Sequence, residues 1–248
     1  MDKEKEIAHW TTDVTMNYHK QQYIEPKRST VALEKFISAH TSIEGNILDL
    51  ACGGGAVDAY IAKLHPQVNM KGIDIVDRAF GMLDEFADED VRKRVSLEVG
   101  DWYNLDRKYV NAFDGVITVQ ALSWLEHWKR PLEKIIELNP KWIALSSLFY
   151  EGRIEFQVKV MDYERNNEIG DHEETYYNVY SLPIVRDYLY EKGYTIFDAK
   201  PFEIDIDIPK PNHLDLGTYT VKTENGNRLQ ISAGMLMPWY FLYAEREG

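Results

Sequence analysis

Residues 46–64, NILDLACGGGAVDAYIAKL, decide the fold of this chain. Ile47 to Ala51 form a short apolar run that is typical of a buried parallel strand. The glycines at 53–55 lack a Cβ, so the backbone there can turn sharply, adopt positive φ and come close to a ligand. The residues that follow have the i, i+3, i+4, i+7 spacing of an amphipathic helix, with inward side chains expected at Val57, Tyr60, Ile61 and Leu64.

This strand, glycine loop and helix also fit part of a dinucleotide-binding motif. That fingerprint needs a third glycine three residues after the second, and the position holds Asp58. The sequence therefore argues against a nicotinamide cofactor. Residues 49–55, DLACGGG, instead resemble motif I of the class I S-adenosylmethionine (SAM)-dependent methyltransferases, an acidic residue followed by G-x-G-x-G. Ala51 replaces the first glycine, and it adds only a methyl group.

Later segments extend this resemblance in the same order along the chain. The strand MKGIDIV (70–76) contains Asp74, 25 residues after Asp49, which leaves room for one helix and a return to a neighbouring parallel strand. The resemblance assigns the Asp74 carboxylate to the ribose hydroxyls of SAM. The stretches LEVGDWYNL and FDGVITVQALSWLEHW resemble the ends of the third and fourth strands, which would place Asp101 and Trp102 at the adenine, and Gln120 and Ala121 at the methionine part.

Each of the three carboxylates also has a structural alternative. Asp49 can cap the loop that follows it, Asp74 can form a turn, and Asp101 can be a helix N-cap. These alternatives do not explain why the three residues occur in family order, each near the end of a predicted strand.

The fold implied is α/β: a doubly wound, seven-stranded, mostly parallel sheet with an N-terminal helical cap and an antiparallel β insertion. Alternating apolar residues at 154–160, an alternating run FEIDIDI at 202–208, and an Asn225-Gly226 hairpin signal predict the insertion, and WYFLYAE (239–245) predicts a reversed last strand. We expect a single domain over residues 1–248, divided into a cap (1–45), a SAM-binding half (46–150), an insertion with acceptor-side elements (151–235), and a last strand (236–248).

Composition limits the partners. The chain has 248 residues and a net charge of −13, which would repel a phosphate backbone and argues against nucleic acid. Its single cysteine, Cys52, cannot form an internal disulfide, and it has no zinc-type spacing partner, so we expect no metal and a reducing, cytoplasmic setting. No apolar run approaches the ~20 residues of a membrane span. We expect a monomer or homodimer.

The resemblance and the residue types together give a set of candidate binding residues. The N-terminal cap of small-molecule methyltransferases often closes over SAM, and Trp10, Tyr18, Tyr23 and Arg28 are candidates there, with surface packing of the aromatics as the alternative. The expected cofactor-binding residues are Tyr18, Arg28, Asp49, Ala51, Cys52, Gly53, Gly55, Asp74, Ile75, Asp101, Trp102, Gln120 and Ala121. The expected substrate-binding residues are Tyr23, Trp124, Tyr176, Tyr177 and Tyr180, whose rings can also simply pack the insertion.

His127 is the candidate catalytic residue. It follows the fourth strand, on the side where the methyl group is expected, and a hydroxyl acceptor would benefit from a general base. The alternative is structural, because Leu125-Glu126-His127 resembles a turn shared by family members that have different acceptors. His172 and His213, in the insertion, are expected to be solvated loop residues.

The function implied is transfer of a methyl group from SAM to an oxygen or nitrogen atom of a small polar metabolite such as a sugar, with S-adenosylhomocysteine as the other product. The sulfonium already makes the methyl group electrophilic, so the protein mainly has to orient the acceptor and exclude water. Two alternatives stay open: a methyltransferase that acts on a protein side chain, and a SAM-binding protein without catalysis.

Overall fold

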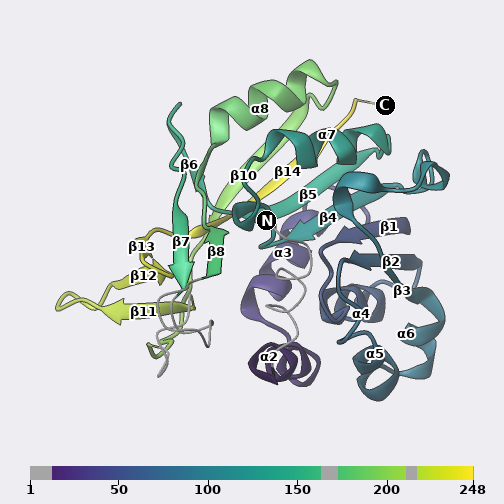
Figure 1. Ribbon diagram of the computed structural model, residues 1–248, viewed down its shortest axis with the longest axis horizontal. Helices are drawn as coiled ribbons and strands as arrows, with labels where there is room; N and C mark the ends of the chain where they lie inside the picture. The colour runs from purple at the N-terminus through teal and green to yellow at the C-terminus, as the bar shows by residue number, and fades with distance from the viewer. Residues whose placement is uncertain (1–12, 163–172, 211–216, 248) are drawn as a thin grey trace.

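The computed structural model describes residues 13–162, 173–210 and 217–247 (Figure 1). Three residues considered above, Trp10, His172 and His213, lie outside these ranges. No helix within the described ranges combines the length and apolar character that a bilayer crossing requires.

The centre of the fold is a seven-stranded sheet with the order β10-β14-β5-β4-β1-β2-β3. All neighbours pair in parallel except β14, which is antiparallel to both β5 and β10. This architecture confirms the predicted fold class. The strands are β1 (Gly45–Leu50), β2 (Val68–Asp74), β3 (Val95–Val99), β4 (Gly115–Val119), β5 (Trp142–Ser147), β10 (Ile196–Phe202) and β14 (Trp239–Glu245).

Helices cover both faces of the sheet (Figure 1). Leu48 and Leu50 of β1 face one helical layer, while Ile47 faces the other, as the two-residue period of a strand buried on both sides requires. The first layer is α7 (Lys129–Glu137) and α8 (Leu182–Glu191). The second is α3 (Arg28–Ser38), α4 (Ala56–Leu64), α5 (Gly81–Phe86) and α6 (Glu89–Arg94), with α2 (Asp13–Ile24) packed on α4 and α5.

The inward face of α4 differs from the expected one. Ala59 and Ala62 are buried, whereas Tyr60 is only half-buried and Leu64 is 49% exposed. Alanines on this face let the helix approach the sheet closely, and the larger side chains lie at its margin. The short helix α6, which the sequence did not predict, completes the crossover between β2 and β3.

The insertion is built from short strands, as expected. They are β6 (Phe149–Tyr150), β7 (Lys159–Asp162), β8 (Glu173–Tyr176), β9 (Tyr180–Ser181), β11 (Thr218–Lys222), β12 (Arg228–Ser232) and β13 (Met235–Leu236). Gly226, at φ 80°, closes the predicted β11–β12 hairpin. One expectation was wrong: of the alternating run 202–208, only Phe202 belongs to a strand, and the rest is extended chain outside the sheet.

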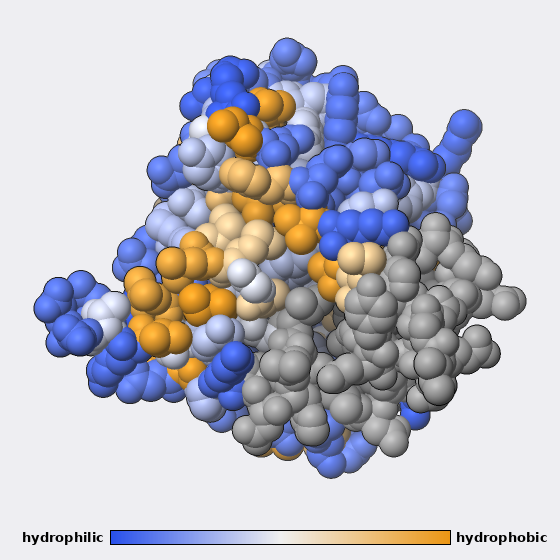
Figure 2. Space-filling model, turned by 60° about the vertical axis from the view of Figure 1, so that its left-hand side comes forward, coloured by the Kyte–Doolittle hydropathy of each residue, from blue (hydrophilic) through white to orange (hydrophobic). Residues whose placement is uncertain are grey.

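The insertion also presents apolar side chains to its outer surface. Figure 2 shows them gathered on the face where β6 to β8 and β11 to β13 lie. The exposed members include Phe156, Met161, Val221, Leu229 and Leu236. The small sheets of the insertion therefore bury only part of its apolar content.

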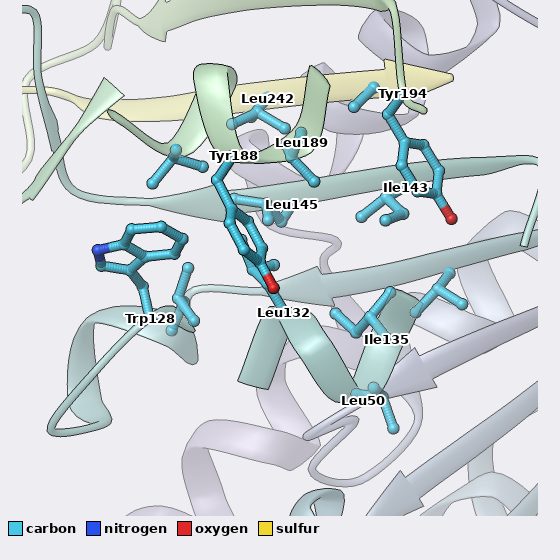
Figure 3. Packing of buried hydrophobic residues seen from close by; sticks show 14 of the residues in the cluster. Leu50, Trp128, Leu132, Ile135, Ile143, Leu145, Tyr188, Leu189, Tyr194 and Leu242 are labelled. Atoms are coloured by element: carbon cyan, nitrogen blue, oxygen red, sulfur yellow. The ribbon is translucent and has the colours of Figure 1, made fainter. Parts of the chain in front are cut away.

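The layer formed by α7 and α8 shows how the core is packed (Figure 3). Leu132 of α7 is fully buried against the sheet, and the rings of Trp128 and Tyr188 meet edge to face with their centroids 5.3 Å apart. The indole Nε1 of Trp128 donates to Glu155 at 2.7 Å, so the aromatic pair also ties this layer to the insertion.

We predict that Leu132→Ala lowers the free energy of unfolding by about 2–5 kcal/mol, because it leaves a cavity in a close-packed layer. The matched control Leu64→Ala removes a half-exposed side chain and should change it by less than about 0.5 kcal/mol. Urea unfolding followed by circular dichroism measures both. Equal effects of the two substitutions would contradict the assigned packing.

Candidate cofactor and acceptor site

A large cavity of about 960 Å³ lies at the carboxyl edge of the sheet. Parallel α/β sheets bind ligands at this edge, beyond the ends of the strands. The ends of β1, β2 and β4 line it, together with the turn after β3, the α2–α3 connection and the insertion. One cavity therefore brings together segments from the first 30 residues to Trp239.

The loop after β1 is held in a conformation that exposes its backbone. Ala51, Gly53 and Gly55 have φ values of 61°, 58° and 77°, in the left-handed region. The amides of Ala51 and Cys52 both donate to the Ile73 carbonyl, at 2.8 and 3.3 Å. A Cβ costs roughly 1–2 kcal/mol in this region, which explains why glycine is the usual residue where Ala51 stands.

Asp74 fastens this loop to the end of β2. Its Oδ2 accepts the amide of Gly53 at 2.8 Å, and its Oδ1 accepts the amide of Val76 at 3.1 Å. Burial raises the pKa of Asp74, and these amide donors act in the opposite direction. The carboxylate lines the cavity and keeps lone pairs for further donors, so it combines the predicted ligand position with the alternative turn-forming role.

Asp101 and Trp102 also line the cavity, in a firmly held turn. Asp101 caps the 3₁₀ turn Trp102–Asn104, accepting from the Tyr103 amide at 2.9 Å and from Asn104 Nδ2 at 2.8 Å. The Trp102 indole donates to the Pro131 carbonyl at 3.1 Å and is mostly buried. Tyr103, which the sequence did not single out, lines the cavity beside them.

The N-terminal cap lies over the glycine loop. Tyr18, His19 and Arg28 line the cavity, and a Cβ on Gly53 would lie 2.5 Å from His19 Cε1, so the imidazole sits directly against the loop. Burial, reinforced by Lys27, lowers the pKa of His19 to about 4, so at neutral pH it is an uncharged hydrogen-bonding group. Sequence reasoning missed His19, and its only signal was its position next to Tyr18.

Two predicted cofactor residues support the loop without lining the cavity. Cys52 is buried beneath the loop, and Gly55 is the N-cap of α4. Of the predicted substrate residues, Tyr23 does not line the cavity either: its hydroxyl donates to the Gly54 carbonyl at 2.6 Å, so it braces the glycine loop. The remaining predicted cofactor residues line the cavity, and they are Asp49, Ala51, Gly53, Ile75, Gln120 and Ala121.

Two of the three tyrosines predicted in the insertion face away from the cavity. Tyr177 lines it with Trp124, but Tyr176 points elsewhere because successive side chains of an extended segment alternate in direction. Tyr180 is buried in the core, and its hydroxyl donates to the Leu125 carbonyl at 2.5 Å. Thr175 and Trp239 line the cavity in their place.

The position of His127 does not support the catalytic role that was expected for it. Its side chain is 64% exposed, its Nε2 lies 3.7 Å from Glu126, and it is not part of the cavity lining. A general base has to be within hydrogen-bond reach of the proton that it accepts. This placement, in the turn after β4 and outside the cavity lining, does not support the catalytic role.

Two buried carboxyl groups lie beneath the loop. Asp49 of β1 and Asp58 of α4 are both fully buried and face each other. Among the described side chains, no hydrogen-bond donor reaches Asp49 Oδ1 or either oxygen of Asp58. Burial raises the pKa of both carboxyls, and the neighbouring Asp58 raises that of Asp49 further. A proton shared between them would satisfy the pair.

Comparison with known proteins agrees with this geometry. Residues 47–139 match the family described as "Methyltransferase domain". The structure is similar to that of magnesium protoporphyrin IX methyltransferase from Synechocystis PCC 6803 with bound S-adenosylhomocysteine, at 13% identity, a TM-score of 0.58 and full coverage of both chains. It is also similar to 1,6-didemethyltoxoflavin-N1-methyltransferase from Burkholderia thailandensis, at 13% identity and a TM-score of 0.56, with 100% of this chain and 92% of that chain covered. No curated protein matched the sequence.

Residues 47–139 thus match a methyltransferase domain, and the strand order is that of the class I methyltransferase fold. The described residues fit SAM, the cofactor of that class. Asp49, Ala51 and Gly53 line the cavity at the end of β1, where the Asp49 carboxyl supplies negative charge for an ammonium group. Asp74 can accept the ribose hydroxyls, and Asp101 can accept from the adenine amino group.

We predict that Asp74→Asn raises the dissociation constant of S-adenosylhomocysteine by at least about tenfold, because a charge-assisted hydrogen bond contributes roughly 1.5–3 kcal/mol. Asp77→Asn, a nearby exposed position outside the cavity, is the control. Isothermal titration calorimetry compares the two. If Asp74→Asn leaves the affinity for S-adenosylhomocysteine unchanged, Asp74 only forms the turn and does not bind the ligand.

A second prediction concerns the buried pair. A carboxyl whose pKa is raised on folding stabilises the protein at low pH, and that contribution is lost as pH rises through the folded-state pKa. Asp58→Asn removes this loss and should raise the free energy of unfolding by about 1–3 kcal/mol at pH 8, with a smaller gain at pH 5. Thermal unfolding at both pH values measures it; a gain that is larger at pH 5 would contradict the shared-proton account.

Proposed function

We propose that the chain transfers the methyl group of SAM to an oxygen or nitrogen atom of a small molecule held in the same cavity. The observation that carries this proposal is the extent of the cavity, which continues from Asp74 and Asp101 past Gln120 to Trp124, Tyr177 and Trp239. At about 960 Å³ it is at the upper end of small-molecule sites, which leaves room for a second ligand beside the cofactor.

The proteins of similar structure support a small-molecule acceptor. One of them contains both 1,6-didemethyltoxoflavin and S-adenosylhomocysteine, and another is named for magnesium protoporphyrin IX. Their identity to this chain is low, so they inform the class of acceptor and not its structure.

The described residues contribute mainly by binding and by excluding water. SAM supplies an electrophilic methyl group, and transfer needs the acceptor atom aligned with it. Gln120, at φ 57°, and the following turn present the end of β4 to the cavity, while Trp124 and Tyr177 pack edge to face with centroids 5.1 Å apart. These residues would hold the acceptor beside the cofactor.

We expect purified protein, methyl-labelled SAM and a small-molecule extract to yield labelled small molecules together with S-adenosylhomocysteine. His127→Ala should retain the wild-type rate because the residue lies outside the cavity, whereas Tyr177→Ala should lower it. Scintillation counting after size separation decides the outcome. Label only in protein would favour a side-chain methyltransferase, and SAM binding without turnover on any fraction would favour a non-catalytic binder.

A further inference from the structure

The part of the cavity beyond the cofactor residues has a distinct lining. We call it the acceptor chamber and define it by Trp124, Tyr177, Ile204, Ile206, Ile208 and Trp239, all of which line the cavity. These residues come from the turn after β4, the insertion and the start of β14. None of the six is charged at neutral pH, and burial raises the pKa of Tyr177 further above its usual range.

The alternating run after β10 forms one wall of the chamber. Ile204, Ile206 and Ile208 line the cavity, whereas the intervening Asp205 and Asp207 are exposed. The alternation that resembled a strand in the sequence therefore separates a ligand-facing side from a solvent-facing side.

Two sets of contacts fix the orientation of this wall. The intervening aspartates are ion-paired, Asp205 with Arg28 of the cap at 3.0 Å and Asp207 with Arg228 at 2.7 Å. The backbone of this wall is also held by Thr220 of β11, whose Oγ1 accepts the Ile208 amide at 2.8 Å and donates to the Ile206 carbonyl at 3.2 Å. The backbone at Ile206 and Ile208 is thus hydrogen-bonded to β11.

Another part of the lining is aromatic. Tyr177 packs edge to face with Trp124 on one side and with Trp239 on the other, at centroid distances of 5.1 and 6.0 Å. The Trp239 indole N–H donates to Thr218 Oγ1 at 3.3 Å, so this donor already has a partner in the protein. Its ring is left as an apolar surface.

The charged side chains that line the cavity are confined to a few elements. The described charged residues that line it come from the cap and the strand ends, and they are Glu25, Lys27, Arg28, Asp49, Asp74 and Asp101.

A sugar bound in the chamber would lose water from several hydroxyls, and each hydroxyl left without a partner costs about 1–3 kcal/mol. An apolar group there gains about 25 cal/mol for each Å² removed from water.

We infer that the acceptor is a predominantly apolar molecule, with a ring system or a branched hydrocarbon held against the isoleucine and aromatic side chains of the chamber, and not a sugar. This inference rests on the proposed function and names the substrate class for the same cavity. It replaces the polar metabolite expected from the sequence.

Binding of a neutral apolar probe tests the chamber without turnover. In the presence of saturating S-adenosylhomocysteine, N-phenyl-1-naphthylamine should bind with a saturable rise in fluorescence. Ile206→Glu, which puts a charge into the wall, should weaken the probe at least about tenfold. Ile206→Leu should retain binding, as should the control Ile154→Glu at an exposed position of the insertion outside the cavity. Equal probe binding by Ile206→Glu and Ile154→Glu would overturn the inference.

A second arm separates this inference from the proposed function. Small molecules from a cell extract are divided between octanol and water, and each fraction is incubated with the protein and methyl-labelled SAM. Label in molecules of the octanol fraction supports the inference. Label only in the aqueous fraction overturns it and leaves the small-molecule proposal standing, whereas label in neither, with probe binding intact, counts against the proposed function alone.

Discussion

The hydrogen bond from the Gly53 amide to the Asp74 carboxylate is the contact on which the site depends. It joins the loop after β1 to the end of β2 at the carboxyl edge of the sheet, and the Ala51 and Cys52 amides, donating to Ile73, close the same junction. Without this hydrogen bond, fewer contacts would stabilise the three left-handed residues of the loop. Tyr23, which donates to Gly54, and His19, which lies against Gly53, extend this support into the cap.

The same junction also brings several acidic side chains close together. Asp49, Asp58 and Asp74 lie near one another below or beside the loop, and burial raises the pKa of each carboxyl. Such a group of acids is unfavourable for the free protein, and a cationic ligand relieves it. SAM carries positive charge at both its sulfonium and its amino group, so the acidic side chains at this junction are complementary to it.

The acceptor chamber is built differently from the cofactor part of the cavity. Its walls come from segments distant in sequence, and hydrogen bonds and ion pairs outside the chamber satisfy their polar groups. Thr220 holds the backbone of Ile206 and Ile208, while Arg28 and Arg228 pair with the intervening aspartates. The interior can then be apolar without leaving buried polar groups unpaired. Because Arg28 also lines the cavity, the cap and the insertion meet at its mouth.

The sequence by itself determined the fold class, the glycine loop, and the acidic residues at the strand ends, because these depend on local spacing and on the fixed direction of parallel strands. It also predicted the hairpin at Gly226 and the reversed last strand. Only the tertiary structure decided which aromatic and histidine side chains reach the cavity. Tyr180 and His127 follow suitable elements but point into the core and into solvent, whereas His19 and Trp239 come from the two ends of the chain. Side-chain direction at a site built from distant segments is set by packing between those segments, which local periodicity does not contain.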